Sequence, residues 1–166
     1  MNGYGLMRRE KAVNNEEKII HILKSCRILH IGLSDGEFPY VIPMSYGYTY
    51  EDGKLTLYLH GGRSGYKYDL IEKNPNCAFS MECDIVPFLG DVPCKSGMAY
   101  MAVCGRGIAS MVEDHEEKKR ALSLIMDLGG WENCSFNEKL TSVVKVFKIE
   151  VTEFTAKERS LPKNMR

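Results

Sequence analysis

Three extended runs separated by two Asp-Gly turns occupy the stretch between the first helical pattern and the middle of the chain. The runs cover residues 27–34, 39–50 and 55–60. Asp35-Gly36 and Asp52-Gly53 stand between them, and Asp-Gly is among the dipeptides most typical of a tight hairpin turn. In the third run every second residue is a leucine, as in a strand that buries one face. The pattern predicts antiparallel strands joined by hairpins.

The rest of the chain alternates between further extended runs and helical patterns. The other strands are expected at 77–83, 98–112 and 143–155, the helices at 14–26, 64–72 and 114–130, and a loop at 84–95. Asn14 with Glu17 resembles a capping box at the start of the first helix. Gly105 and Gly107 permit a bend or bulge in the long strand. Because six strands occur without a regular βαβ succession, the sequence predicts an α+β fold, a small, mainly antiparallel barrel with peripheral helices.

The composition is that of one folded domain with no excess of charge. The chain has 166 residues, with 22 lysines and arginines against 22 aspartates and glutamates, so we expect a single domain over 1–166. We expect residues 1–12 to form an N-terminal arm and residues 156–166 a C-terminal tail. The balanced charge disfavours binding to a nucleic-acid backbone. Since no apolar run approaches the ~20 residues of a membrane span and no signal segment is present, we expect no membrane partner and a cytoplasmic location.

The cysteines and histidines do not form a metal-binding pattern. The six cysteines contain no Cys-x-x-Cys pair and no repeated spacing, and the four histidines are scattered along the chain. We therefore expect no metal site, and we expect free thiols in a reducing compartment.

One segment, LYLHGGRSGYKYDLI (residues 57–71), combines a strand, a glycine-rich turn, two cations and the start of a helix. Glycines let the backbone approach an anion closely, and the free amides of a helix N-terminus attract negative charge. Arg63 and Lys67 are four residues apart, so both side chains can reach that end of the helix. The pattern indicates a phosphate-binding cradle. An exposed turn with surface cations is the alternative, because GGRSG matches neither the P-loop nor the GxGxxG fingerprint.

Four segments together carry a wider pattern. They are RILHIGLSDGEFPYVIPMSYGY, DGKLTLYLHGGRSGYKYDLI, NPNCAFSMEC and AYMAVCGRGIASMVED, and they contain the linked motifs G-L-S-x-G, P-Y-x-x-P and H-x-x-x-x-G-x-K. Over about residues 10–155, their order and spacing resemble those of the flavin-binding split-barrel proteins related to pyridoxamine 5′-phosphate oxidase, and within them the nitroimidazole-resistance (Nim-type) subgroup. The resemblance implies a six-stranded split β-barrel that binds FMN at the interface of a homodimer.

The resemblance also implies which residues hold the cofactor. It assigns the FMN phosphate and ribityl chain to His60, Gly61, Gly65, Tyr66 and Lys67, while the cradle argument adds Arg63 as a further phosphate ligand. It places Val41, Ile42, Pro43, Met44 and Ser45 along one edge of the isoalloxazine ring, with Tyr100 and Val103 beside the ring. Nim-like relatives often have a serine where this chain has Ala102, so one polar flavin contact is in doubt.

His60 is the candidate for a catalytic role. It stands at the end of a strand beside the cradle, and an imidazole titrates near neutral pH. Three roles are open to it: binding the anion, donating a proton near the flavin, or making only a structural hydrogen bond. His30, in an otherwise apolar run, is expected to be a barrel residue.

The resemblance implies an FMN-dependent oxidoreductase. A reduced nicotinamide, NAD(P)H, or another donor would supply electrons, and a small flat acceptor such as a nitroaromatic or quinone-like compound would receive them. The flavin performs the electron chemistry, so the chain needs no catalytic dyad. The alternatives are a flavin-binding or sensing protein without turnover, a deazaflavin as cofactor, and a haem-associated split barrel with His60 or His30 as the iron ligand. Oxidation of pyridoxamine phosphate is disfavoured, because the C-terminal KERSLPKNMR lacks that group's Arg-x-His pattern.

Overall fold

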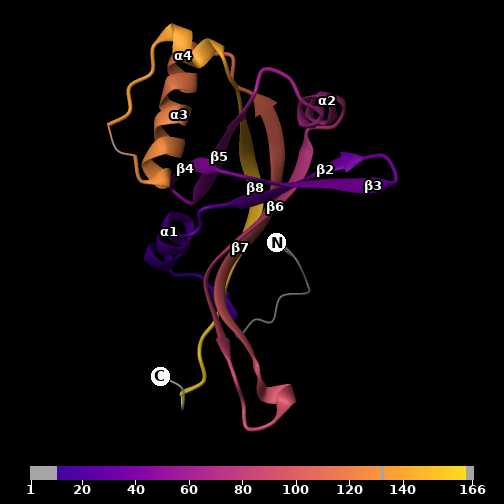
Figure 1. Cartoon of the computed structure of the whole chain (residues 1–166), viewed down its shortest axis with the longest axis vertical. Coiled ribbons are helices and arrows are strands. Elements are labelled where there is room, and N and C mark those ends of the chain that lie inside the picture. Colours follow the sequence, from indigo (N-terminus) through magenta and orange to yellow (C-terminus); the bar gives the residue numbers. More distant parts are fainter. Residues whose placement is uncertain (1–10, 132, 164–166) are drawn as a thin grey trace.

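The computed structural model describes residues 11–131 and 133–163 as a curved antiparallel sheet with helices outside it (Figure 1). In chain order the elements are β1 (Ala12–Val13), α1 (Glu16–Ser25), β2 (Leu29–Asp35), β3 (Phe38–Met44), β4 (Tyr46–Glu51), β5 (Lys54–Gly61), α2 (Tyr66–Lys73), β6 (Asn76–Phe88), the 3₁₀ helix η2 (Pro93–Lys95), β7 (Gly97–Met111), α3 (His115–Gly129), α4 (Glu138–Ser142) and β8 (Lys145–Arg159). The strands pair in the order β3-β2-β6-β7-β8-β5-β4, and β1 pairs with β8. The expected α+β fold is confirmed.

The link at Ser45 forces the sheet to close on itself. β3 and β4 are the two ends of the pairing order, yet a single residue separates Met44 from Tyr46. Neighbouring strands lie about 4.7–4.9 Å apart, and one residue spans at most ~3.6 Å, so this link is far too short to cross a flat sheet. The sheet therefore curves until β3 and β4 adjoin at Ser45, as in a split barrel, although these two edge strands form no ladder with each other. For the same reason the run predicted as one strand over 39–50 is in fact two strands.

The interior of the barrel is filled by aliphatic side chains from alternate strand positions. In β2, Leu29, Ile31 and Leu33 are buried, while the residues between them are partly exposed. The main core continues through β5, β6, β7 and β8 and includes the inner face of α1. A smaller cluster, with Ala121 and Ile125 of α3, lies between that helix and the sheet. The alternation that predicted the strands is thus the alternation that builds the core.

Helix α3 is held tightly against the strands β4 and β5. At the start of α3, the Asp114 side chain accepts a hydrogen bond from the Glu117 amide at 2.7 Å. At the end of α3, Gly130 adopts the left-handed conformation with φ of 94°. Gly47 of β4 lies directly beneath it. A Cβ at this position would come within 2.6 Å of the Ile125 backbone nitrogen, so the close approach of the helix requires glycine.

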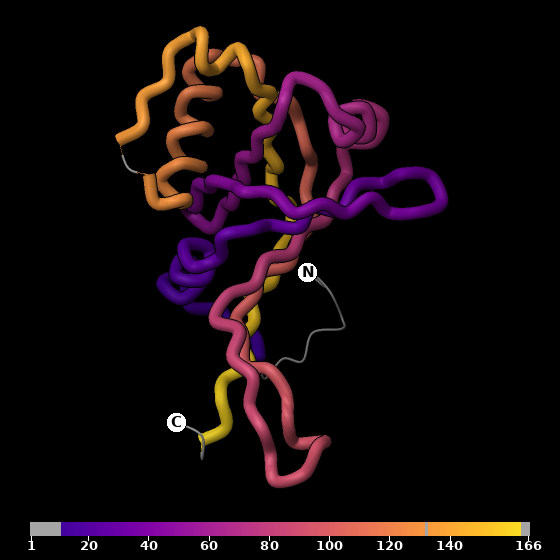
Figure 2. Tube along the Cα trace, in the orientation of Figure 1, coloured from indigo at the N-terminus to yellow at the C-terminus, as the bar shows by residue number. Residues whose placement is uncertain are grey.

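Strands β6 and β7 extend beyond the barrel as a long two-stranded arm (Figures 1 and 2). The two strands pair from Asn76 opposite Ile108 to Phe88 opposite Gly97. The prediction of a loop over 84–95 is therefore wrong for its first five residues. The pairing register shifts just after Cys83, and this bulge lets the strand continue through the irregular sequence.

Several expected element boundaries move by a few residues. The first helix is capped by Asn15 rather than Asn14, because the Asn15 side chain accepts a hydrogen bond from the Lys18 amide at 2.9 Å. The bulge expected at Gly105 and Gly107 is confirmed by a register shift between Arg106 and Gly107.

The two ends of the described chain both reach the sheet. β8 runs through Arg159, so residues 156–159, which we expected in a tail, lie in a strand. In β1, Ala12 pairs with Lys157 of β8. Ala12, the last residue of the expected N-terminal arm, therefore lies in the sheet. Residues 1–10 of that arm lie outside the described residues. Helix α4 was not predicted. Among the helices of the described ranges, none is long and apolar enough to cross a membrane.

Candidate functional site

The glycine-rich turn lies between the end of β5 and the start of α2, as the sequence predicts. β5 ends at Gly61 and α2 begins at Tyr66. Gly65 precedes the helix with φ of 156°, a backbone conformation that other residues rarely adopt, and it supplies no side-chain cap. The helix N-terminus is therefore open to an anion that approaches along the turn.

Two lysine ammonium groups lie over the Tyr68 ring beside this turn, from segments far apart in the chain. The Lys67 ammonium lies 4.5 Å from the centroid of the Tyr68 ring, and the Lys145 ammonium lies 5.0 Å from the same centroid. Lys145 is directly opposite Gly61 in the β5–β8 ladder. A Cβ at Gly61 would lie 2.7 Å from the Tyr68 hydroxyl and 2.9 Å from the Lys67 ammonium nitrogen, so glycine lets these two groups approach the end of β5 closely.

Two buried polar atoms beside the lysines have no hydrogen-bond partner within the described part of the chain. They are Nδ1 of His60 and the hydroxyl oxygen of Tyr68. A buried polar atom without a partner costs about 1–3 kcal/mol, and native proteins keep few of them. Two such atoms beside two cations indicate a place for a polar, negatively charged ligand. We name the group of His60, Gly61, Lys67, Tyr68 and Lys145 the cradle.

The His60 ring is held in its neutral form. Burial lowers the pKa of this imidazole, and the positive charge of Lys67 lowers it further. At neutral pH the ring therefore carries one N–H donor and one acceptor nitrogen. A neutral imidazole of this kind binds and orients a ligand better than it supplies a proton.

Two other expected phosphate ligands point elsewhere. Nε of Arg63 donates a hydrogen bond to the Ser142 carbonyl at 3.0 Å, so the base of its guanidinium is tied to the end of α4. The Tyr66 hydroxyl donates to the Asp35 carboxylate at 2.5 Å, on the β2–β3 hairpin, and the Tyr66 ring packs edge-on against Tyr40. The Tyr66 side chain thus connects α2 to the hairpin and does not face the Lys67 ammonium.

The residues expected along the flavin ring edge alternate between two environments. Val41, Pro43 and Ser45 are exposed, whereas Ile42 and Met44 are half-buried and pack against the main core. β3 stands at one end of the pairing order, so its outer edge forms no ladder with another described strand. The backbone amides and carbonyls of that edge are available to a planar ligand.

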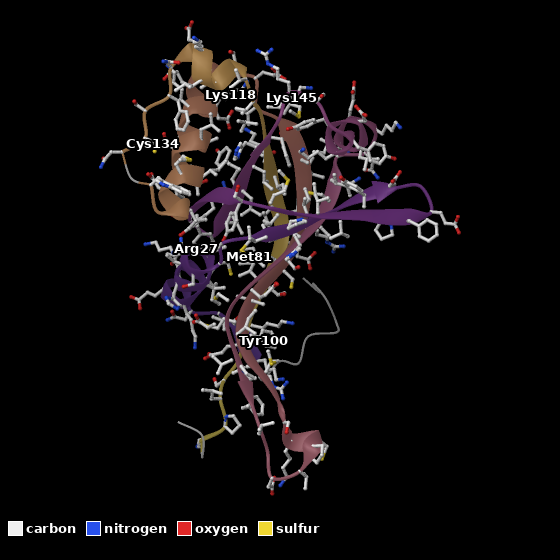
Figure 3. The ribbon with its side chains drawn as sticks, in the orientation of Figure 1. Arg27, Met81, Tyr100, Lys118, Cys134 and Lys145 are labelled. Atoms are coloured by element: carbon white, nitrogen blue, oxygen red, sulfur yellow. The ribbon has the colours of Figure 1, made fainter. Side chains whose placement is uncertain are left out.

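The structure does not bring Tyr100 and Val103 to the cradle within one chain. Val103 is fully buried in the main core. Tyr100 pairs with Arg159 of β8, fourteen positions along the strand from Lys145 (159 − 145), and its ring lies 5.2 Å from the Lys157 ammonium. Figure 3 shows Tyr100 toward the arm and Lys145 at the opposite end of the sheet.

The sequence analysis missed Tyr68 and Lys145. The sequence analysis gave Tyr68 no role, and only the register of β8 against β5 places Lys145 opposite Gly61. No three His, Cys, Asp or Glu side chains of the described ranges gather as metal ligands. His30 lies on β2 with its Nδ1 4.0 Å from the Glu82 carboxylate, away from the cradle.

Comparison with known proteins identifies the family. The sequence profile described as pyridoxamine 5′-phosphate oxidase matches residues 15–158. The chain belongs to this family. Its members' flavin chemistry gives the chain a flavin-associated function, and the cradle fits a flavin phosphate because it combines unpaired buried polar atoms with two cations. No curated protein sequence matches the chain.

Several solved structures share the fold. A candidate 5-nitroimidazole antibiotic resistance protein from Bacteroides thetaiotaomicron has 30% sequence identity and a TM-score of 0.75, over 89% of this chain and 86% of that one. A flavocytochrome from Azotobacter vinelandii has 20% identity and a TM-score of 0.75, over 94% and 73%. An FAD and haem binding protein from Mycobacterium smegmatis has 13% identity and a TM-score of 0.74, over 92% and 76%. The expected likeness to the Nim-type subgroup and to the split barrels is confirmed.

The environment of His60 predicts its titration. In the protein without flavin, we expect a pKa below the ordinary value of about 6.5, because burial and Lys67 both oppose protonation. Replacing Lys67 by methionine should raise this pKa without bringing it to the ordinary value, since burial is the larger cause. The His60 C2 proton, followed by NMR against pH, measures the change.

Lys73→Met, at the exposed end of the same helix, is the matched control and should leave the His60 pKa unchanged. Because the folded-state pKa lies below the unfolded one, His60 stabilises the fold above pH ~6.5, and this contribution is lost as the pH falls through the folded-state value. A His60 pKa at or above 6.5 in the flavin-free protein would contradict the assignment.

Proposed function

We propose that this protein is an FMN-dependent oxidoreductase that reduces a small flat acceptor. The observation that carries the proposal is the cradle, where two unpaired buried polar atoms and two ammonium groups lie beside Gly61, close to a helix N-terminus. Membership in the pyridoxamine 5′-phosphate oxidase family supports the same cofactor class. When bound, FMN supplies the electron-transfer chemistry, and the chain supplies binding and orientation.

Each part of the site has its own task in this proposal. Lys67 and Lys145 neutralise the phosphate, while Gly61 and Gly65 let the backbone approach it. His60 positions the phosphate end through its neutral ring, and we assign it orientation rather than proton supply. The open edge of β3, over residues 41–45, offers backbone hydrogen bonds to the isoalloxazine ring.

The acceptor we propose is a nitroaromatic or quinone-like compound, and the donor is NAD(P)H. The 30% identity to a candidate nitroimidazole-resistance protein supports the acceptor class. A flavin stacks with planar compounds, and a shallow exposed strand face such as that of Val41 and Pro43 admits them. The six free cysteines support a reducing compartment and thus a cytoplasmic location.

Removing the Lys67 charge should weaken FMN binding. We expect Lys67→Ala to raise the FMN dissociation constant about 10- to 100-fold, the equivalent of about 1.5–3 kcal/mol for a hydrogen bond to a charged group. Lys73→Ala removes an equal charge from the other end of α2 and should change the constant little. Quenching of flavin fluorescence measures both. Equal FMN affinities in the two variants would contradict the cradle assignment.

Reduction of the bound flavin by NAD(P)H distinguishes an oxidoreductase from a protein that only binds flavin. We expect the FMN-loaded protein, mixed with NADPH or NADH without air, to lose its yellow colour within the time of steady-state turnover and to regain it when a nitroaromatic compound is added. Absorbance spectroscopy follows both steps. Persistent colour would favour the non-catalytic alternative, and a Soret band in the purified protein would favour haem, a cofactor named for two structural neighbours.

We also propose that the protein is a homodimer with FMN between its subunits. Large apolar side chains are exposed on the β6–β7 arm and the β2–β3 hairpin, namely Ile85, Val86, Leu89, Val92, Met98, Phe38 and Val41. Such a concentration of exposed apolar surface is typical of a protein interface. Light scattering of the FMN-loaded protein should give twice the 18.8 kDa chain mass, and a monomer would contradict the proposal.

A further inference from the structure

Two buried thiols of the main core contact one another from distant segments. Cys26 directly follows α1 and is fully buried, and Cys83 of β6 is 7% exposed. A hydrogen bond joins the two side chains, although 57 positions separate them in the chain (83 − 26). A disulfide joins sulfur atoms at about 2.05 Å. The two side chains therefore have to close only the difference between a hydrogen bond and a covalent bond.

The backbone around each sulfur holds the pair together. The Cys26 amide donates to the Ile22 carbonyl at 3.0 Å, and the Cys26 carbonyl accepts from the Tyr46 hydroxyl at 3.4 Å. Cys83 is paired with Met101 in the β6–β7 ladder. Helix α1 packs against these two strands, and Figure 1 shows it beside them. Both sulfurs thus belong to fixed segments, and their contact is a property of the folded chain.

Cys83 stands at a weak point of its strand. The ladder register shifts between Cys83 and Val86. Asp84 has φ of 52°, in the left-handed region that residues other than glycine rarely adopt. An interrupted ladder opens locally more easily than a regular one. Asp84 also lines a cavity of about 240 Å³ together with Met101, the ladder partner of Cys83. Cys83 is therefore the member of the pair that a small oxidant reaches first.

The two thiols differ in how readily they ionise. Burial raises the pKa of both, so both are protonated at neutral pH. Their shared hydrogen bond works against this rise in Cys83 and adds to it in Cys26, which is the pattern expected when Cys26 donates and the Cys83 sulfur accepts. Because the thiolate is the nucleophile, Cys83 reacts first, and Cys26 supplies the second sulfur. The raised pKa values make the reaction slow.

We propose that Cys26 and Cys83 form a redox modification site, at which hydrogen peroxide converts the two thiols into a disulfide. The Cys83 thiolate attacks one peroxide oxygen and the O–O bond breaks. The leaving hydroxide takes the proton that Cys83 released, which gives a sulfenic acid and one water. The Cys26 sulfur then attacks the sulfenic sulfur. The S–S bond forms, the S–O bond breaks, and the hydroxide leaves with the Cys26 proton as a second water.

The disulfide ties the end of α1 to the base of the β6–β7 arm. Two thiols are oxidised in this reaction and one peroxide is reduced. In a reducing compartment, cellular thiols reverse it by exchange, so the disulfide is transient there. The crosslink restricts the unfolded chain between its two ends and so stabilises the folded protein.

Peroxide treatment of the full, folded chain tests the site. The reduced protein is exposed to hydrogen peroxide, its remaining thiols are blocked with N-ethylmaleimide in denaturant, and its proteolytic peptides are mapped by mass spectrometry. We expect a pair of peptides joined through Cys26 and Cys83, lighter by two hydrogens and separated by dithiothreitol. The Tm should rise by about 5–15 °C on oxidation and fall back on reduction. The exposed Cys94 shows by its own oxidation that the peroxide was active.

A matched pair of variants identifies the reacting sulfur. Cys83→Ser should abolish both the crosslink and the rise in Tm. Cys77→Ser, on the same strand, should keep both, because Cys77 is equally buried but donates to the Gly107 carbonyl at 3.4 Å.

The mapping of the unaltered chain decides the proposal even where a variant does not fold. If Cys26 and Cys83 remain free thiols while Cys94 is oxidised, or if Cys83 joins a different cysteine, the proposal is overturned. The experiment needs no flavin, so its result is independent of the proposed function.

Discussion

The pairing of β5 with β8 is the constraint on which the site depends. It sets Lys145 opposite Gly61, although 84 positions separate them in the chain (145 − 61). Without this ladder, the turn after β5 would carry one lysine and an exposed helix end. With it, a second lysine reaches the Tyr68 ring. Ser45 joins the two edge strands of the sheet that contains this ladder, so the ladder is part of a curved sheet.

Most of the fold can be predicted because its signals are local. Alternating leucines, Asp-Gly turns and the Asp114 cap each act within a few residues, and each is confirmed. The failures involve contacts between distant segments. Residues 84–88 look like a loop on their own, and they become a strand because β7 offers a partner on the other side of a bulge. The break at Ser45 is invisible for the same reason, since both sides of it are equally suited to a strand.

In the candidate site, too, the sequence reveals the residues that are close together in the chain and misses those brought in by distant segments. The glycines, His60 and Lys67 lie within eight consecutive positions, so one motif reveals them. Lys145 belongs to another element, and a change of one residue in the register of β8 would turn Lys145 to the other face of the sheet. Arg63 and Tyr66 show how distant contacts affect residues inside the motif. Both lie within the motif, yet their side chains have partners on α4 and on the β2–β3 hairpin.

The energetics of the cradle explain why it suits a ligand better than it suits the empty protein. His60 and Tyr68 each bury a polar atom without a partner, and the Lys67 and Lys145 ammonium groups each lie over the Tyr68 ring. The unpartnered atoms destabilise the fold without a ligand, whereas the contacts between the ammonium groups and the ring are favourable. A bound phosphate removes the cost of the unpartnered atoms, because it accepts hydrogen bonds, and it is also attracted to both ammonium groups. The main core, with fully buried residues such as Phe147 and Ile149 directly below, supplies the stability that lets the turn keep this arrangement. The cradle is thus preorganised before the ligand binds, and preorganisation favours tight binding of a small anionic group.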